Sequence, residues 1–540
     1  MAVVKFSRKE FEKYVKISKD VEEKIALFGT PLESLSADEV EIEIFPNRPD
    51  LLSMQGYLRS FLAFLAKKTG IREYKINSPE KDFEINIDKS VRDVRPFTAC
   101  AIVKGIKFDD EKIKEVIDIQ EKIHNTLGRN RKKIAIGVYP LEKIQLPIKY
   151  EARKPEEIKF IPLESNKEMN GMQILRQHPT GRDYAHLLAG KDKFPVFVDS
   201  ANEILSMPPI INSEKTGKID ENTKEVFIEC SGFNFDILKK TLNILVTMLA
   251  DMGGKVYEMK LNYAKSEVTP DLTPEKMKIN IENANKLLGV NLSEKDVKRF
   301  LERMGYNYGG GVVEVPAWRT DILHEVDIIE DIGIAYGYDN FVPEIPEIFT
   351  IGEEDKNEVL KRKISNILSG LKLQEVSSYH LLMKDDLKKI GEKGWIEVEK
   401  SKTDYKFLRK NLFASILKVL SENIDSEYPQ KIFEIGKVFE LGGGETGVLE
   451  RDNLAVAITP GNFTEIKQIL EYLGKMLDVE IKIEAVEKEG FIDGRVGEII
   501  AGGVAGVVGE VHPSVLKSWH LKMPLVYLEI DLDKIFEKLT

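Results

Sequence analysis

A proline-punctuated segment in the middle of the chain is the feature that most constrains its fold. The run TPDLTP occupies residues 269–274, and Pro343 and Pro346 form a second break further on. Proline fixes its own φ and donates no backbone hydrogen bond, so neither a helix nor a central strand continues through such segments. We therefore expect separate domains, and 540 residues at about 150 per domain suggest three to four of them.

The composition narrows the class of protein. The chain is 42% hydrophobic and 31% charged, which is typical of globular proteins and excludes a largely disordered chain. Its formal net charge of -11 argues against a general nucleic-acid coat protein, so RNA contacts would come from local basic patches. Cys100 and Cys230 are too few for a disulfide scaffold or a cysteine-based zinc site. No apolar run approaches the ~20 residues that cross a bilayer, and no signal peptide is evident, so we expect a cytoplasmic protein.

Local patterns predict a mixture of helices and strands. A G-x-G-x-x-G run at 442–447 lies between two strand-like segments, so we interpret it as a hairpin turn, because a dinucleotide site needs a helix directly after it. Apolar periodicity predicts helices at 51–68, 109–127, 236–252, 356–371 and 407–420. Strands are predicted at 99–103, 133–139, 194–198, 226–230, 375–382, 431–441 and 454–459.

An acidic segment near residue 330 is a candidate metal site. Asp327, Glu330 and Asp331 are spaced i, i+3 and i+4, so a helix places them on one face, with Ile328 and Ile332 on another. An all-oxygen cluster suits Mg²⁺. A solvated acidic face near a helix N-terminus explains the same pattern, so the spacing alone leaves both interpretations open.

Two further segments are candidates for ligand contact. Residues 129–133 carry four basic side chains, which could contact a phosphate backbone or form a solvated turn. Residues 206–214, SMPPIINSE, place polar side chains on a backbone stiffened by two prolines. That arrangement suits a small-molecule pocket and also an ordinary loop, so neither segment is decisive by itself.

Several strings taken together resemble a known family. In chain order they are NRPDLLS (47–53), RPFTAC (95–100), LGRNRKK (127–133), PPIINSE (208–214), RTDILHEVDIIEDIGIAYGY (319–338), PQKIFEIG (429–436), FTEIK (463–467) and GEVHP (509–513). The chain resembles the beta subunits of phenylalanyl-tRNA synthetase, of the archaeal and eukaryotic type, over essentially its whole length. Each string alone is weak evidence for the family, but eight strings in one order are strong evidence.

The resemblance implies an α+β multidomain fold. Expected are an N-terminal B1-like α/β unit (1–78), a B3/B4-like editing and tRNA-interaction domain (79–265), a small B5-like, winged-helix-like domain (266–345), and a catalytically silent class II synthetase-like antiparallel sheet domain (346–540). No Phe-Arg dipeptide and no G-x-G-x-x-R occur, so the ATP-binding motifs of class II synthetases are absent. The active site for phenylalanine and ATP would therefore lie in an alpha subunit of an α2β2 complex that charges tRNA(Phe).

The resemblance also implies site residues. The magnesium ligands would be Asp321, Asp327, Glu330 and Asp331. An editing pocket that hydrolyses Tyr-tRNA(Phe) would contain Ser206, Asn212, Ser213, Glu229 and Ser231, with Arg129 and Asn130 near the tRNA 3′ end or the ester. The family more often has aspartate at position 229, so glutamate reaches one methylene further. No Ser-His-Asp or Cys-His pattern is evident, so a positioned water is expected to attack the ester. A stand-alone RNA-binding scaffold and a free-standing editing hydrolase are the alternatives.

Overall fold

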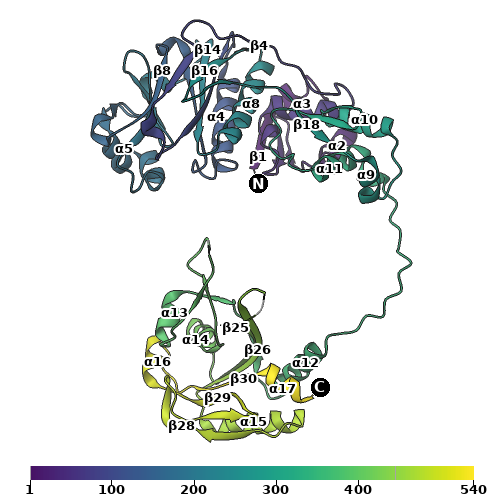
Figure 1. The fold of residues 1–540 in the computed structure, drawn as a ribbon, viewed down its shortest axis with the longest axis vertical. Coiled ribbons are helices and arrows are strands. Elements are labelled where there is room, and N and C mark those ends of the chain that lie inside the picture. The colour runs from purple at the N-terminus through teal and green to yellow at the C-terminus, as the bar shows by residue number, and fades with distance from the viewer. Residues whose placement is uncertain (1, 400, 444, 540) are drawn as a thin grey trace. The chain divides into compact units, whose positions relative to one another are not determined.

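The chain forms two compact units, residues 1–345 and 346–540, which are described separately. The computed structural model describes residues 2–399, 401–443 and 445–539, and Figure 1 shows the elements of each unit. Among these residues, none of the helices is long and apolar enough to cross a lipid bilayer. The cytoplasmic location expected from the sequence stays a prediction.

The first unit begins with a small sheet packed on a helix. Strands β1 (Ala2–Ser7), β3 (Glu39–Ile44) and β2 (Leu32–Leu35) pair in that order. Helix α3 (Met54–Phe64) begins where the Ser53 side chain accepts a hydrogen bond from the Gly56 amide. Tyr57 of α3 is buried against Phe6 and Phe11, which fixes α3 on the sheet and leaves its Gln55–Arg59 side for other contacts.

Two sheets form the central part of this unit. The first has the order β4-β15-β6-β14-β7, and the second has the order β13-β12-β11-β8-β5-β16-β17. Their strands are β4 (Ile76–Asn77), β5 (Glu84–Ile87), β6 (Phe97–Lys104), β7 (Ile134–Pro140), β8 (Ile148–Arg153), β11 (Phe194–Val198), β12 (Ile204–Met207), β13 (Ile211–Asn212), β14 (Glu225–Gly232), β15 (Lys255–Tyr257), β16 (Met259–Asn262) and β17 (Ser266–Thr269). The predicted strands at 99–103, 133–139, 194–198 and 226–230 are confirmed.

Side chains that alternate along β14 pack into two different hydrophobic cores. Val226, Ile228 and Cys230 pack with helices α4 (Asp110–Asn125) and α8 (Phe235–Asp251), which cover one face of the five-stranded sheet. Phe227, on the opposite face, joins a core with the seven-stranded sheet. Because side chains alternate along a strand, Glu229 shares the face of Phe227 and lies between the two sheets.

A small helical domain completes the first unit. Strands β18 (Glu275–Lys278), β20 (Val312–Val315) and β19 (Asn307–Gly309) form its sheet, in that order. Helices α9 (Ile281–Leu288), α10 (Glu294–Arg303) and α11 (Glu325–Tyr336) pack beside it. The predicted acidic helix is therefore present, and its Ile328, Ile329 and Ile332 are buried as the amphipathic pattern requires.

The second unit is built on one sheet of order β21-β25-β26-β30-β29-β28-β27, in which every pair except β21–β25 is antiparallel. Its strands are β21 (Gln374–Glu375), β25 (Gln430–Leu441), β26 (Val448–Thr459), β27 (Lys482–Ala485), β28 (Phe491–Ile500), β29 (Val504–Val511) and β30 (Val526–Asp531). Helices α12 (Lys356–Gly370) and α15 (Phe463–Leu477) pack in one core, and α14 (Phe413–Glu422) in another. The glycine-rich run joins β25 to β26, so the predicted hairpin turn is confirmed.

Two predicted elements of this unit are wrong. The strand expected at 375–382 is divided into β21 and the separate β22 (Leu381–Leu382), and the helix expected from 407 starts only at Phe413. Residues 407–408 instead form β24, which pairs with β22. The next residue, Arg409, is buried against Glu434 at 2.8 Å, so a tertiary ion pair overrides the local helical pattern.

Candidate functional site

A buried carboxyl group lines the cavity of the first unit that best fits a ligand-binding site. Glu229 pairs with Cys100 of β6 and Gly137 of β7, and its side chain is almost fully buried. It lines a cavity of about 560 Å³ together with Asn212, Arg131 and Glu121. The walls are largely apolar and include Ile113, Ile136, Val138, Ile211 and Ile219. A mainly apolar cavity of this size with a few polar groups is the usual form of a small-molecule site.

Tyr139 links two polar residues that line this cavity, Asn212 and Glu229, to Ser206, although neither Tyr139 nor Ser206 lines it. Its hydroxyl lies 2.8 Å from Ser206 Oγ, 3.3 Å from Asn212 Oδ1 and 3.2 Å from Glu229 Oε1. These residues come from β7, β12, β13 and β14, so the two sheets meet at this hydroxyl. The structure thus brings the predicted Ser206, Asn212 and Glu229 together. The sequence analysis missed Tyr139, although strand alternation places it on the face of Gly137.

Two glycines make room for this cluster. A Cβ atom added at Gly137 would lie 2.1 Å from the Tyr139 hydroxyl oxygen, so any side chain there would displace the ring. A Cβ atom at Gly217 would lie 2.7 Å from Asn212 Cβ. The positions of both polar side chains therefore depend on the absence of a neighbouring side chain.

The protonation of Glu229 follows from its surroundings. Burial raises the pKa of Glu229 to about 8, although the charge of Arg95 and contacts from Tyr139 and Ser231 act in the opposite direction. The group is therefore mainly neutral at pH 7. Its Oε1 accepts from Tyr139, while Oε2 has no hydrogen-bond partner among the described residues. We therefore place the proton on Oε2, where it can be donated to a ligand.

The other predicted editing residues do not line the cavity. Ser231 is buried, and its Oγ accepts a hydrogen bond from Arg95 Nε at 3.1 Å. Ser213 is also buried, and its amide bonds to the Leu205 carbonyl, but it does not line the cavity. Arg129 and Asn130 are exposed and are not among the residues that line the cavity. Their contact with the tRNA 3′ end stays a prediction.

Arg131 is the residue of the basic segment 129–133 that lines the cavity. Residues 129–131 have φ values of 49°, 53° and 62°. The backbone of the turn that they form therefore lies in the left-handed region, and its conformation differs from that of a regular hairpin turn. Arg131 donates to the Ile210 carbonyl at 2.8 Å and to Glu121 Oε1 at 2.6 Å. Hydrogen bonding from His124, together with the charge of Arg131, lowers the pKa of Glu121 to about 2. The cavity thus has an ionic cluster at one place and the neutral Glu229 at another.

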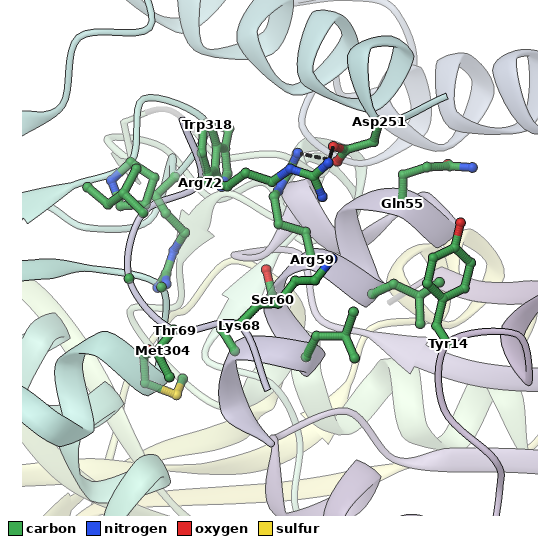
Figure 2. A pocket seen from close by; sticks show the side chains of 18 of the residues that line it. Tyr14, Gln55, Arg59, Ser60, Lys68, Thr69, Arg72, Asp251, Met304 and Trp318 are labelled. Atoms are coloured by element: carbon green, nitrogen blue, oxygen red, sulfur yellow. Dashed lines mark hydrogen bonds and ion pairs between the residues drawn. The ribbon is translucent and has the colours of Figure 1, made fainter. Parts of the chain in front are cut away.

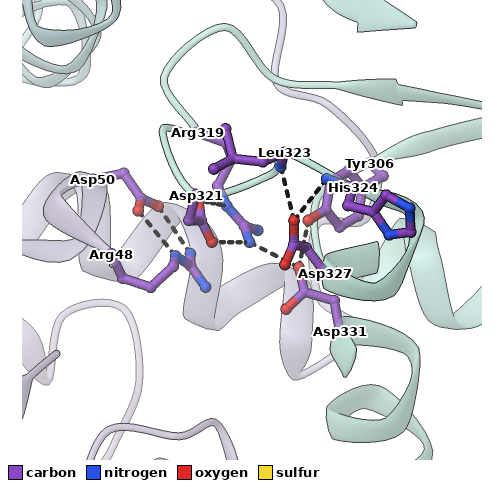
Figure 3. A network of polar contacts seen from close by, with 9 residues as sticks. All are labelled: Arg48, Asp50, Tyr306, Arg319, Asp321, Leu323, His324, Asp327 and Asp331. Atoms are coloured by element: carbon purple, nitrogen blue, oxygen red, sulfur yellow. Dashed lines mark hydrogen bonds and ion pairs between the residues drawn. The ribbon is translucent and has the colours of Figure 1, made fainter. Parts of the chain in front are cut away.

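Two of the predicted magnesium ligands, Asp321 and Asp331, contact Arg319, and Asp327 lies beside them (Figure 3). Asp321 accepts from Arg319 Nε at 2.8 Å and from Nη2 at 2.7 Å. Asp331 accepts from the same Nη2 at 2.9 Å and from the Tyr306 hydroxyl. Burial opposes ionisation of Asp321, but Arg319 and Arg48 hold its pKa below the ordinary value. Two of the four carboxylates therefore already have a cationic partner.

The remaining two carboxylates, those of Asp327 and Glu330, make fewer contacts with other side chains. Asp327 Oδ2 accepts from the amides of Leu323 and His324 at 2.8 Å each, which caps the N-terminus of α11. Glu330 is exposed and has no hydrogen bond or ion pair with any residue that the structure describes. All four carboxylates line one cleft of about 720 Å³. Within the described ranges, however, no three His, Cys, Asp or Glu side chains are close enough to hold a metal ion.

Three family models match consecutive parts of the chain. Residues 105–246 match the B3/4 domain, 277–338 match the tRNA synthetase B5 domain, and 343–532 match the phenylalanyl tRNA synthetase beta chain CLM domain. The cavity around Glu229 therefore lies mainly in the B3/4 domain, and the acidic helix lies in the B5 domain. These domains define a multidomain α+β chain of the aminoacyl-tRNA synthetase class, which confirms the expected fold class.

Full-length relatives specify the family. The chain is 39% identical to the phenylalanine–tRNA ligase beta subunit of Thermococcus sibiricus, over 91% of this chain and 90% of that protein. It is 37% identical to the beta subunit of Archaeoglobus fulgidus, over 99% of each. A crystal structure of an N-terminal fragment of the Pyrococcus horikoshii beta subunit aligns with a TM-score of 0.59 and 34% identity, covering 62% of this chain and 99% of the fragment. The chain belongs to the family of phenylalanine–tRNA ligase beta subunits.

Proposed function

We propose that this beta subunit acts with an alpha subunit, in an α2β2 complex, to attach phenylalanine to tRNA(Phe) using ATP. We further propose that its B3/4 domain hydrolyses Tyr-tRNA(Phe). The observation that carries the editing proposal is Glu229, a buried carboxyl with an unpartnered oxygen in a largely apolar cavity. The apolar walls suit an aromatic ring, and Glu229 supplies a hydrogen bond for a phenol.

Editing follows from the chemistry of the two amino acids. Tyrosine differs from phenylalanine by one hydroxyl, and an apolar pocket rejects such a near-isostere only weakly. A second site that hydrogen-bonds the hydroxyl selects tyrosine, because phenylalanine would leave the buried polar groups of that site unpaired. Tyr139, Asn212 and Glu229 form such a group.

Hydrolysis needs a water molecule rather than a protein nucleophile in this site. The thiols of Cys100 and Cys230 are buried, burial raises the pKa of both, and neither lines the cavity. We propose that Arg131 and Glu121 lie on the ester side, because they form an ion pair in the lining of the cavity, while the phenol lies toward Glu229. Water attack on the ester carbonyl would then release tyrosine and leave the tRNA hydroxyl free.

The first test combines assembly with deacylation. A tagged chain should isolate a complex with the mass of α2β2 by native mass spectrometry, and this complex should deacylate Tyr-tRNA(Phe) at least about tenfold faster than Phe-tRNA(Phe). Deacylation by a chain without a partner would support the free-standing hydrolase instead. A lone chain that binds tRNA but deacylates neither substrate would support the RNA-binding scaffold.

We also propose that the acidic cleft binds Mg²⁺. Glu330 and Asp327 would be the direct ligands, and Asp321 and Asp331 would keep the neighbouring residues in position through their ion pairs with Arg319. The support is chemical: all four carboxylates line one cleft, and the Glu330 carboxylate has no competing partner. Mg²⁺ commonly keeps several waters and uses one or two carboxylates, so two direct ligands suffice. When bound, the ion would supply positive charge that the acidic helix face otherwise lacks.

Calorimetric titration with Mg²⁺ tests this site without measuring catalysis. Wild-type protein should bind one ion per chain in the cleft, and Glu330→Gln should weaken that binding at least about tenfold, since it removes a charged ligand. Glu282→Gln, an exposed acid on neighbouring α9, is the matched control and should change nothing. Equal Mg²⁺ affinity in wild type and Glu330→Gln would reject the cleft as the site.

A further inference from the structure

A second cavity lies where three parts of the first unit meet, and no step of aminoacylation or editing uses it. It has a volume of about 400 Å³ and is bounded by α3, the loop 66–72 after α3, the C-terminal end of α8 and the loop that carries Trp318. Figure 2 shows Arg59, Arg72 and Asp251 grouped beside Trp318. A cavity of this size can hold a small ligand.

The charges lining this cavity are unbalanced. Arg59 lies 3.0 Å from Asp251, and Arg72 lies 3.1 Å from the same carboxylate. Lys68 is exposed at the cavity and has no ion pair in the part of the chain that the structure describes. Arg48 and Arg319 also line the cavity, but each is paired with its own aspartate. Arg59 and Arg72 therefore share one carboxylate, and with Lys68 the three cations exceed it by two positive charges.

Arg59 is held in place with unused hydrogen-bond donors. Its side chain is 5% exposed, and Nη1 donates to the Tyr74 hydroxyl at 2.8 Å and to Asp251 at 3.0 Å. The guanidinium carbon lies 4.4 Å from the Trp318 ring centre, so the indole covers one face. Nε and Nη2 have no partner among the described residues. Buried donors without partners are rare and call for a ligand, water or ion.

The loop that carries the other two cations is fixed as well. The Gly70 amide donates to the Glu302 carbonyl at 2.7 Å, and the Ile71 amide donates to Asn307 Oδ1 at 3.1 Å. These two bonds join the loop to the neighbouring small domain on both sides of the turn. Lys68 and Arg72 are thus attached to a backbone that is positioned before any ligand arrives, which lowers the ordering cost of binding.

We propose that this cavity binds the phosphate group of a small phosphomonoester. A phosphomonoester carries about −1.5 to −2 charges at pH 7, which matches the two unmatched positive charges. Guanidinium groups bind phosphate oxygens with paired N–H donors, and Arg59 has two N–H groups in one plane for that purpose. Gln55 Oε1 is also buried without a partner in the described part of the chain, and it can accept from a hydroxyl of the same ligand.

Calorimetry on the full chain in its native complex tests this inference with inorganic phosphate, ribose 5-phosphate and sulfate as probes. Ribose 5-phosphate should saturate one site per chain and bind more tightly than sulfate. The variants Lys68→Gln and Arg72→Gln should each weaken its binding, and the double variant at least about tenfold, because charge-assisted hydrogen bonds are lost. Both side chains are exposed, so the fold should survive. Lys67→Gln, an exposed neighbour outside the cavity, should bind as wild type does.

Three outcomes would overturn the inference. The first is the absence of saturable binding of ribose 5-phosphate by the wild type. The second is a failure of specificity. Sulfate and ribose 5-phosphate would then bind equally well, or the double variant would bind ribose 5-phosphate as tightly as the wild type does. The third is weaker tRNA binding by the double variant while no small phosphate saturates the wild type, which would assign the cavity to an RNA backbone phosphate.

Discussion

Glu229→Ala should abolish the preference of the editing site for tyrosine, whereas Glu229→Gln should keep it. The reason is the neutral state of the buried carboxyl, whose pKa is raised to about 8, so at pH 7 the group donates a hydrogen bond to the phenol. Glutamine retains an N–H donor of similar length, and alanine retains none. Leaving the phenol unpaired in a buried site costs about 1–3 kcal/mol, which corresponds to a roughly 5- to 150-fold loss in Tyr-tRNA deacylation.

The pH dependence separates this role from a purely structural one. In the wild type, Glu229 loses its proton as pH rises through about 8, so selectivity for Tyr-tRNA over Phe-tRNA should fall above that pH. Glutamine does not titrate, so Glu229→Gln should keep its selectivity across the same range. Deacylation of both substrates, corrected for spontaneous hydrolysis, gives the measurement. If the Gln variant behaves like the Ala variant at pH 7, the ionised carboxylate is the active form.

Combining Glu229→Ala with Asn212→Ala should release Tyr-tRNA from the complex while sparing phenylalanine charging. Both residues line the B3/4 cavity, and neither belongs to the CLM domain. Single-turnover charging with phenylalanine is the control, and it should stay within about twofold of the wild type, because the proposed charging site lies in the alpha subunit and its transition-state contacts are unchanged. Unchanged mischarging in this double variant would place the editing site elsewhere.

Arg319→Met should be among the most destabilising single substitutions of the first unit. Arg319 is 3% exposed and pairs with both Asp321 and Asp331, and Tyr306 donates to Asp331 beside it. Removing the cation leaves two buried carboxylates without a counter-charge, and breaking such a buried group costs about 3–5 kcal/mol. Hydrogen exchange of α11 amides reports the loss locally, because this multidomain chain is not expected to unfold in one step.

An exposed arginine of the same domain provides the matched control. Arg299 pairs with Asp296 on α10, but its side chain is 64% exposed, so Arg299→Met should cost about 0–1 kcal/mol. Adding Asp321→Asn and Asp331→Asn to Arg319→Met should restore part of the protection, because the unpaired charges are then removed. Similar protection in Arg319→Met and Arg299→Met would show that the buried ion pairs contribute little.

The sequence determined the family, the fold class and most of the elements, since strand alternation and helical periodicity are local patterns. It also identified Ser206, Asn212 and Glu229 as candidates, because a resemblance assigns the site residues of a family to the matching positions of this chain. It failed where a distant partner competes with a local pattern, as at Arg409, where the ion pair with Glu434 holds residues 407–408 as a short strand.

Only the tertiary structure decided how the side chains act together. The sequence does not reveal that Tyr139 bridges two sheets, or that Arg131 rather than Arg129 or Asn130 reaches the cavity. It also does not reveal that Arg319 already neutralises two predicted metal ligands. Burial, charge pairing and the raised pKa of Glu229 depend on residues far apart in the chain, whereas a sequence pattern records neighbours along it.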